Sequence, residues 1–143
     1  GRDVLPIYNG TDAQQHHPAV KRLRAAAEQA DGFFICTPEY HSGMSGALKN
    51  AIDFLGSKYF KEKPVTIAAV TGGGKGGINA LGNLRTVMRA VYGLVLPGQF
   101  AADPHHFNEQ NELVDNAAKE RLTAIIDELY SLTNLLLLAK AEK

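Results

Sequence analysis

The sequence predicts an α/β protein in which a parallel sheet lies between layers of helices. Short aliphatic runs alternate with longer amphipathic patterns along the whole chain. The runs are continuously apolar, which is typical of strands that are covered on both faces. Strands separated by helices favour parallel βαβ units and a three-layer sandwich. No repeat or linker interrupts the pattern, so residues 1–143 form a single domain.

The first elements are an extended piece and a helix. Val4 to Tyr8 (VLPIY) reads as extended chain, and Pro6 favours a sheet edge or a strand end. His17-Pro18 then opens a helix, which Gly32 ends. Its apolar face consists of Val20, Leu23, Ala27 and Ala30.

A buried strand, a polar loop and an apolar helix follow. Phe33 to Thr37 (FFICT) predicts a doubly buried strand, in which Cys36 is an inert buried thiol. The loop Pro38 to Gly46 leads into a helix from about Ser45 to Gly56, and Ser45 is placed to cap it. The apolar arc of this helix is wider than one core stripe: Ala47, Leu48, Ala51, Ile52, Phe54 and Leu55. The helix therefore either lies deep in a monomer or covers both its own sheet and a partner subunit.

The second half of the chain repeats the alternation. Val65 to Val70 predicts a second buried strand, and the run GGGKGG follows it. The next helix has Ile78, Leu81, Leu84, Met88 and Val91 on one face and ends at Gly93. Leu94 to Leu96 predicts a third strand, which is broken at Pro97-Gly98, and a last helix runs from about Asn111 to Ala139.

Two unusual loops, Pro38 to Gly46 and Gly72 to Gly77, directly follow predicted strands. Because the carboxyl ends of parallel strands meet at one edge of a sheet, both loops are expected at the edge where such folds bind ligands.

The glycine-rich loop matches known phosphate motifs only in part. Gly72, Gly74 and Gly77 satisfy G-x-G-x-x-G, but the acidic residue expected about 20 positions later is absent from the sequence. A Walker loop fails because Gly76, not Ser or Thr, follows Lys75. Either backbone N–H groups approach a flat or anionic ligand here, or the loop is a flexible surface turn.

The first loop offers mixed chemistry. Glu39, Tyr40, His41 and Ser42 supply an acceptor, an aromatic face, an imidazole and a hydroxyl. A hydrolase with Ser45 as nucleophile, with Asp103 and His105 downstream, is disfavoured, because Ser45 lies eight residues beyond the strand.

Composition excludes several classes of protein. Lys plus Arg and Asp plus Glu both number 15, so no net charge favours nucleic acid or membranes. The longest leucine run, Leu135 to Leu138, is too short for a membrane span. A single cysteine excludes an internal disulfide and suits a reducing compartment. The doubled histidines, His16-His17 and His105-His106, predict no metal site, because adjacent side chains diverge and no acidic or cysteine cluster has ligand spacing around them.

Three motifs together resemble the NADPH-dependent FMN reductase family, in particular its azobenzene reductase branch of bacilli: TPEYHSGMSGALKNAIDFL, GGGKGGINAL and LPIYNG. The resemblance implies a flavodoxin-like fold with strand order 2-1-3-4-5, bound FMN, and a homodimer or homotetramer in the cytoplasm. It also implies hydride transfer from NADPH or NADH to the flavin and on to quinones, azo compounds, chromate or free flavins.

The resemblance also assigns site residues. Pro38, Glu39, Tyr40 and His41 would wall the ribityl chain and the ring, with Ser42 and Gly43 in the same loop. Gly72, Gly73, Gly74 and Lys75 would approach the pyrimidine end and stabilise the charge that reduction adds. His41 stands where the wider family has Asn, and Ser45 where it has Pro. No catalytic side chain is expected, because the flavin supplies the chemistry.

The match to the family begins only at strand 2. Strand 1, the phosphate loop and helix 1 of the family have no counterpart here, so we expect a fragment of a longer chain. Because strand 1 is central in the family order, we also expect its loss to split the sheet. One alternative function is therefore a remnant that has lost FMN together with its phosphate loop. The other alternative is a flavodoxin-like electron carrier, against which the neutral, glycine-lined site argues.

Overall fold

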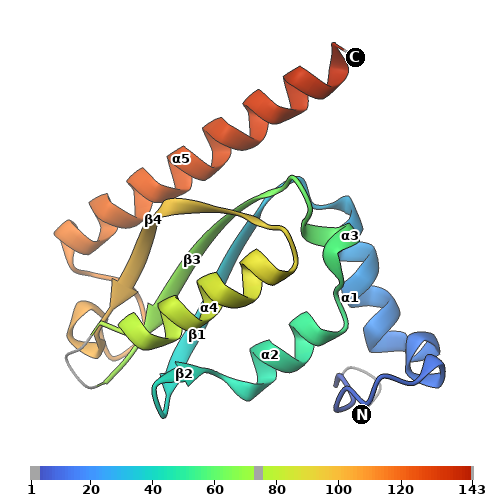
Figure 1. The fold of residues 1–143 in the computed structure, drawn as a ribbon. Coiled ribbons are helices and arrows are strands. Elements are labelled where there is room, and N and C mark those ends of the chain that lie inside the picture. Colours follow the sequence, from blue (N-terminus) through green and yellow to red (C-terminus); the bar gives the residue numbers. More distant parts are fainter. Residues whose placement is uncertain (1–3, 73–75, 143) are drawn as a thin grey trace.

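The computed structural model describes residues 4–72 and 76–142 of the chain (Figure 1). Its elements, in order, are η1 (Asp12–His16), α1 (Pro18–Gln29), β1 (Phe33–Tyr40), β2 (Gly43–Met44), α2 (Gly46–Asp53), α3 (Ser57–Phe60), β3 (Pro64–Val70), α4 (Ile78–Ala90), β4 (Leu94–Ala102), η2 (Pro104–His106) and α5 (Asn116–Ala141).

The sheet has the order β2-β1-β3-β4. β1, β3 and β4 are parallel, as predicted, while β2 pairs antiparallel with the end of β1. The sheet is therefore mixed, and the prediction of a wholly parallel sheet is wrong at this one edge. The cause is local, because β1 turns back on itself before α2 begins.

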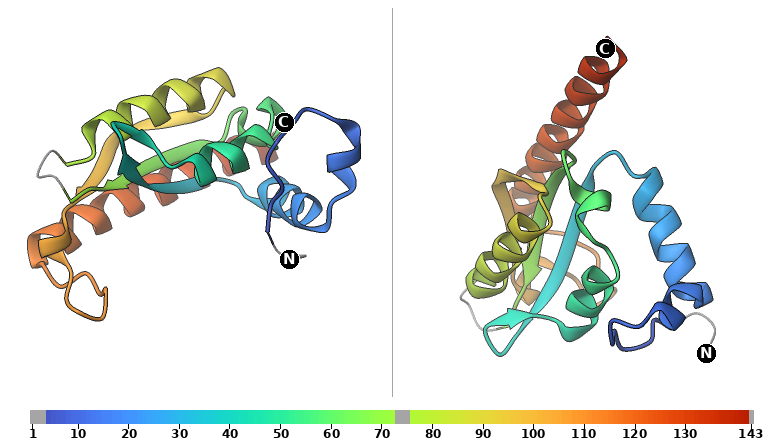
Figure 2. Two further views of the ribbon diagram at one scale, coloured as in Figure 1. Left: turned by 90° about the horizontal axis from the view of Figure 1, so that it is seen from below. Right: turned by 45° about the vertical axis from the view of Figure 1, so that its right-hand side comes forward.

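Helices cover both faces of the sheet, which confirms the three-layer α/β arrangement (Figure 2). On one face, α2 and α4 pack on a core that includes Ile52, Ile67 and Leu84. On the other face, α5 contacts β3 and β4 through a smaller core that includes Ala68 and Ala118. Ile67 and Ala68 are neighbours in β3 and point to opposite faces, so this strand is covered on both sides.

The helices begin where capping chemistry predicts. α1 starts at Pro18, after His17, whose Nδ1 accepts the Ala19 N–H at 3.2 Å. α5 starts at Asn116, five residues later than predicted, because residues 107 and 113 pair and Asp115 caps the helix at the Ala118 N–H.

β4 is longer than predicted, because it continues past Pro97 and Gly98 to Ala102. Its register against β3 shifts between Val65↔Val95 and Ile67↔Gln99, so the proline lies in a bulge. Arg85 stabilises this bulge: its guanidinium donates to the Leu96 oxygen at 3.0 Å, the Pro97 oxygen at 2.9 Å and the Gln99 Oε1 at 3.0 Å. The predicted break is therefore bridged by one side chain of α4.

The two faces of β1 differ. Phe33 and Ile35 pack on the core beneath α2 and α4, but Phe34 is 40% exposed and Cys36 reaches solvent. The predictions of a strand buried on both faces and of a buried thiol are therefore wrong, while the inertness of the thiol stays a prediction. Because α5 lies over β3 and β4, this face of β1 is left uncovered by it.

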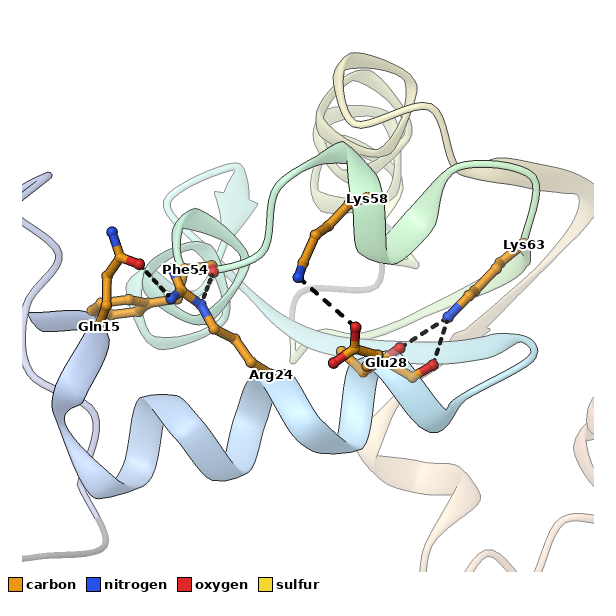
Figure 3. Close-up of polar contacts among 7 residues, drawn as sticks. Gln15, Arg24, Glu28, Phe54, Lys58 and Lys63 are labelled. Carbon is orange, nitrogen blue, oxygen red and sulfur yellow. Dashed lines mark hydrogen bonds and ion pairs between the residues drawn. The ribbon is translucent and has the colours of Figure 1, made fainter. Parts of the chain in front are cut away.

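α1 lies beside the sheet and is held there by polar contacts (Figure 3). The Arg24 Nε donates to the Phe54 oxygen at 3.0 Å, and the Lys63 Nζ donates to the Ala27 oxygen at 3.0 Å. Lys58 and Glu28 approach to 3.8 Å, but this pair is exposed and adds at most about 1 kcal/mol.

Residues 4–8, predicted as extended chain, lie against α2 and not in the sheet. The Asn50 side-chain amide accepts the Tyr8 N–H at 2.8 Å and donates to the Pro6 oxygen at 2.9 Å. Tyr8 also packs edge-on against Phe54. The three parallel strands stay together, but residues 4–8, where the match to strand 2 of the family begins, lie outside the sheet. This separation agrees with the predicted split of the sheet at the position of strand 1.

α5 is long and projects beyond the sheet (Figure 1). By length and composition alone it could cross a membrane, contrary to the prediction from the leucine run. It contacts β3 and β4, however, and its outer apolar side chains, among them Tyr130, Leu135 and Leu138, are exposed.

Candidate functional site

The first candidate loop is a tight hairpin. β1 extends to Tyr40, which pairs with Gly43, so His41 and Ser42 form a two-residue turn. Their φ values are 49° and 63°, and two positive values in succession are typical of a type I′ turn. For a residue other than glycine, a positive φ costs about 1 kcal/mol or more of conformational free energy. The predicted irregular loop at 38–46 is therefore largely strand and turn, with the exposed side chains of Tyr40 and His41 at its tip.

The base of the hairpin is fixed by buried hydroxyls. The Thr37 Oγ1 accepts the Ser45 N–H at 2.9 Å and donates to the Pro38 oxygen at 2.8 Å. The Ser45 Oγ in turn accepts the Leu48 N–H at 3.2 Å and caps α2 as predicted. Because Ser45 is buried and its hydroxyl is engaged as a cap, it is poorly placed to act as a hydrolase nucleophile.

Glu39 joins the first loop to the second. Its Oε2 accepts the Ala80 N–H at 3.0 Å, in the first turn of α4. The residue before this helix is Gly77, which has no side chain with which to cap it. A carboxylate at a helix N-terminus also interacts favourably with the helix dipole. Sequence reasoning assigned Glu39 to the cofactor wall and missed this contact, because Glu39 and Ala80 are 41 positions apart.

The glycine-rich loop has two parts. Gly76 and Gly77 have φ values of 62° and 66°, and a Cβ on Gly77 would lie 2.6 Å from the Ala69 Cβ, so only glycine fits there. Gly72 is exposed, and a Cβ on it would meet nothing within 4 Å. Gly73, Gly74 and Lys75 lie outside the described residues, and their assigned roles stay predictions.

The two loops lie side by side at one edge of the sheet. Pro38 at the end of β1 pairs with Val70 at the end of β3, which confirms the predicted neighbourhood of the loops. The Thr71 N–H donates to the Ala102 oxygen at 3.2 Å, so the end of β4 adjoins the same edge. The structure thus brings residues 38–43 and the described glycines together.

A third group at this edge contradicts one premise of the sequence reasoning. The rings of His105 and His106 do not diverge: their centroids are 4.1 Å apart. They lie in the short helix η2, where the His106 Nδ1 accepts the Asp103 N–H at 3.0 Å.

The described residues fit the ring of a flavin better than its phosphate. The open space beside Gly72 and the exposed ring of Tyr40 allow a flat group to approach. A phosphate normally needs several free N–H groups at a helix N-terminus. At α4, however, the Glu39 carboxylate already accepts a hydrogen bond from one of these N–H groups, and its negative charge would repel a phosphate.

Comparison with known proteins agrees with the resemblance of the motifs. A family model described as NADPH-dependent FMN reductase matches residues 1–107. The chain is 46% identical, over 127 residues, to an NADPH azoreductase from Bacillus sp. (strain OY1-2), and covers 70% of that protein. It is 34% identical to the FMN-dependent NADPH-azoreductase of Staphylococcus aureus (strain USA300), of which it covers 63%.

A solved structure shares the fold. The flavoenzyme NAD(P)H:(acceptor) oxidoreductase FerB from Paracoccus denitrificans superposes with a TM-score of 0.76 at 23% identity. The match covers 91% of this chain and 75% of FerB.

Proposed function

This chain belongs to the NADPH-dependent FMN reductase family, and from that premise we propose that it is an FMN-dependent NAD(P)H oxidoreductase of the azoreductase type. The observation that carries the proposal is the pair of loops at the carboxyl edge of the sheet, joined by the bond from Glu39 to Ala80. In this fold class ligands bind at that edge.

The bound FMN would accept hydride from the nicotinamide and pass it to the acceptor. The protein's part is to hold the ring and leave one face open. Tyr40, which is 62% exposed at the hairpin tip, offers an aromatic face for stacking, with His41 and Ser42 beside it. Backbone N–H groups of residues 72–75, with the Lys75 ammonium, would stabilise negative charge on the pyrimidine end.

The acceptors we propose are quinones, azo compounds and free flavins, with NADPH or NADH as the hydride donor. The two azoreductase relatives support an azo acceptor and NADPH. Neither hydride transfer, from the nicotinamide to the flavin or from the flavin to the acceptor, needs a side chain that acts as acid or base, because the flavin carries the redox chemistry.

We also propose that the protein is cytoplasmic and forms a homodimer or homotetramer. The outer side of α5 supports self-association: Tyr130 is 69% exposed, Leu135 62% and Leu138 64%. Exposed apolar groups that gather on one element often mark an interface between proteins.

The test is oxidation of NADPH by an azo dye and by a quinone, with FMN added. We expect turnover with wild-type protein. Tyr40→Ala should raise the FMN Kd about 5-fold, because a ring stack is worth about 1 kcal/mol. Tyr92→Ala is the matched control: Tyr92 is 64% exposed but lies next to the opposite end of the sheet, before β4. If neither the azo dye nor the quinone supports oxidation of NADPH, the proposal is contradicted.

A further inference from the structure

A cluster of three potential metal ligands follows β4. Asp103, His105 and His106 each offer one ligand atom, and these atoms all lie within 4.8 Å of one another. The turn η2 folds the chain back so that residues close in sequence converge on one point. From this geometry we propose a divalent metal site at the carboxyl end of β4, separate from the flavin loops.

Asp103 gives independent support for a positively charged ligand. Its Oδ1 is buried and has no hydrogen-bond partner among the described residues. A desolvated carboxylate oxygen without a donor is costly, and a cation would stabilise it. His105, in contrast, is exposed, so an ion can reach the site from solvent.

The donor set determines the class of metal. Two imidazole nitrogens and one carboxylate oxygen suit Zn²⁺, Co²⁺ or Ni²⁺, whereas Mg²⁺ and Ca²⁺ prefer oxygen ligands alone. Three protein ligands leave at least one position for water, as in open zinc sites.

The site must contract to bind. In a tetrahedral Zn²⁺ site with bonds of about 2.0–2.2 Å, ligand atoms lie roughly 3.3 Å apart, closer than the present limit of 4.8 Å. His105 is exposed and can change rotamer. His106 must release the Asp103 N–H from its Nδ1, either to bind the metal through Nδ1 or to carry its proton there while Nε2 binds the metal. Because this rearrangement costs a hydrogen bond, we expect affinity in the micromolar range, weaker than that of closed structural sites.

The chain contains its own control. His16 and His17 are also adjacent, and the His17 Nδ1 likewise accepts a backbone N–H. Within residues 4–72 and 76–142, no comparable three-ligand cluster includes this second pair. If adjacent histidines alone bound metal, both pairs would do so.

The experiment is calorimetric titration of tag-free protein with Zn²⁺ at pH 7.5 in a non-chelating buffer. We expect one micromolar site, weakened about 10-fold or more by His105→Ala and by Asp103→Asn, and changed less than about twofold by His16→Ala with His17→Ala. Mg²⁺ should bind at least about 100-fold more weakly.

Two results would overturn the proposal. One is equal Zn²⁺ affinity in wild type, His105→Ala and Asp103→Asn. The other is loss of binding only when His16 and His17 are replaced. His105 is exposed, so the His105→Ala variant keeps the test valid if Asp103→Asn fails to fold. None of the three ligands belongs to the proposed flavin loops, so reductase activity and metal binding can each fail without the other.

Discussion

Replacing Glu39 should both destabilise the fold and loosen the candidate site. The Glu39→Ala change removes the acceptor that holds the Ala80 N–H at 3.0 Å. A hydrogen bond to a charged group contributes about 1.5–3 kcal/mol, and a carboxylate at a helix N-terminus about 0.3–1 kcal/mol. These two estimates overlap, because one carboxylate makes both interactions, so the expected loss of stability is about 2–3 kcal/mol. Glu39→Gln keeps an acceptor but removes the charge, and should cost about 0.5–1 kcal/mol.

The assay is urea unfolding of the protein without added FMN. With a slope of about 2 kcal/mol per molar urea, Glu39→Ala should lower the midpoint by roughly 1 M at unchanged slope. Glu109→Ala is the control, since Glu109 is exposed and should change stability by less than about 0.5 kcal/mol.

Binding of FMN gives a second measurement on the same variants. Because Glu39 ties the hairpin to the glycine loop, FMN affinity should fall more in Glu39→Ala than in Glu39→Gln. If Glu39→Ala unfolds at the same urea concentration as Glu109→Ala, the contact with Ala80 does not hold the two loops together, and the account of this edge is wrong.

Three other substitutions or modifications test separate features. Gly77→Ala should destabilise the protein by about 2 kcal/mol or more, because Gly77 has a positive φ and the added Cβ would lie close to the Ala69 Cβ. Gly82→Ala is the control: it lies in α4 with nothing within 4 Å of the added Cβ, and should stabilise the protein by up to about 1 kcal/mol. Thermal unfolding that ranks the two variants in the opposite order would refute this prediction. Cys36 reaches solvent on one side but is partly covered by its neighbours, and this partial desolvation raises the pKa of its thiol. At pH 8 its thiolate fraction and its rate of iodoacetamide alkylation should therefore be lower than those of an unstructured cysteine peptide, and the difference should close as the pH rises above the folded pKa. An equal rate at pH 8 would contradict the shift. Leu135→Glu should reduce the molar mass measured by light scattering if α5 forms the subunit contact, and an unchanged oligomer would exclude that helix face.

Much of the fold follows from local pattern. The cap at His17-Pro18, the buried strand before the glycine run and the helix at Ile78 are specified by neighbouring residues, and the structure confirms them. The errors arise where distant groups decide. Pro97 predicts the end of a strand, yet Arg85 on α4 binds the carbonyl oxygens of the bulge and lets β4 continue.

The continuous apolar run of β1 also led to a wrong prediction, namely that helices cover both of its faces. Phe34 and Cys36 have the apolar character of a doubly covered strand, but burial depends on where α5 lies, and no local pattern determines that. Likewise, Asn50 pairs with the backbone of residues 6 and 8, so a segment with strand composition lies on α2.

The candidate site was predictable in position but not in its internal contacts. The rule that loops after parallel strands share an edge placed residues 38–43 beside Gly72. The bond from Glu39 to Ala80 and the convergence of His105 with Asp103 depend on turn geometry, which residue spacing does not reveal.

The central claim is tested most directly by adding NADPH to the FMN-loaded protein without oxygen while following the visible flavin absorption. We predict that the protein retains FMN through gel filtration, that NADPH bleaches the absorption, and that an azo dye restores it. Retained flavin that NADPH does not bleach would contradict the reductase function and point to an electron carrier. Failure to retain FMN would contradict the assignment of a flavin site to these loops.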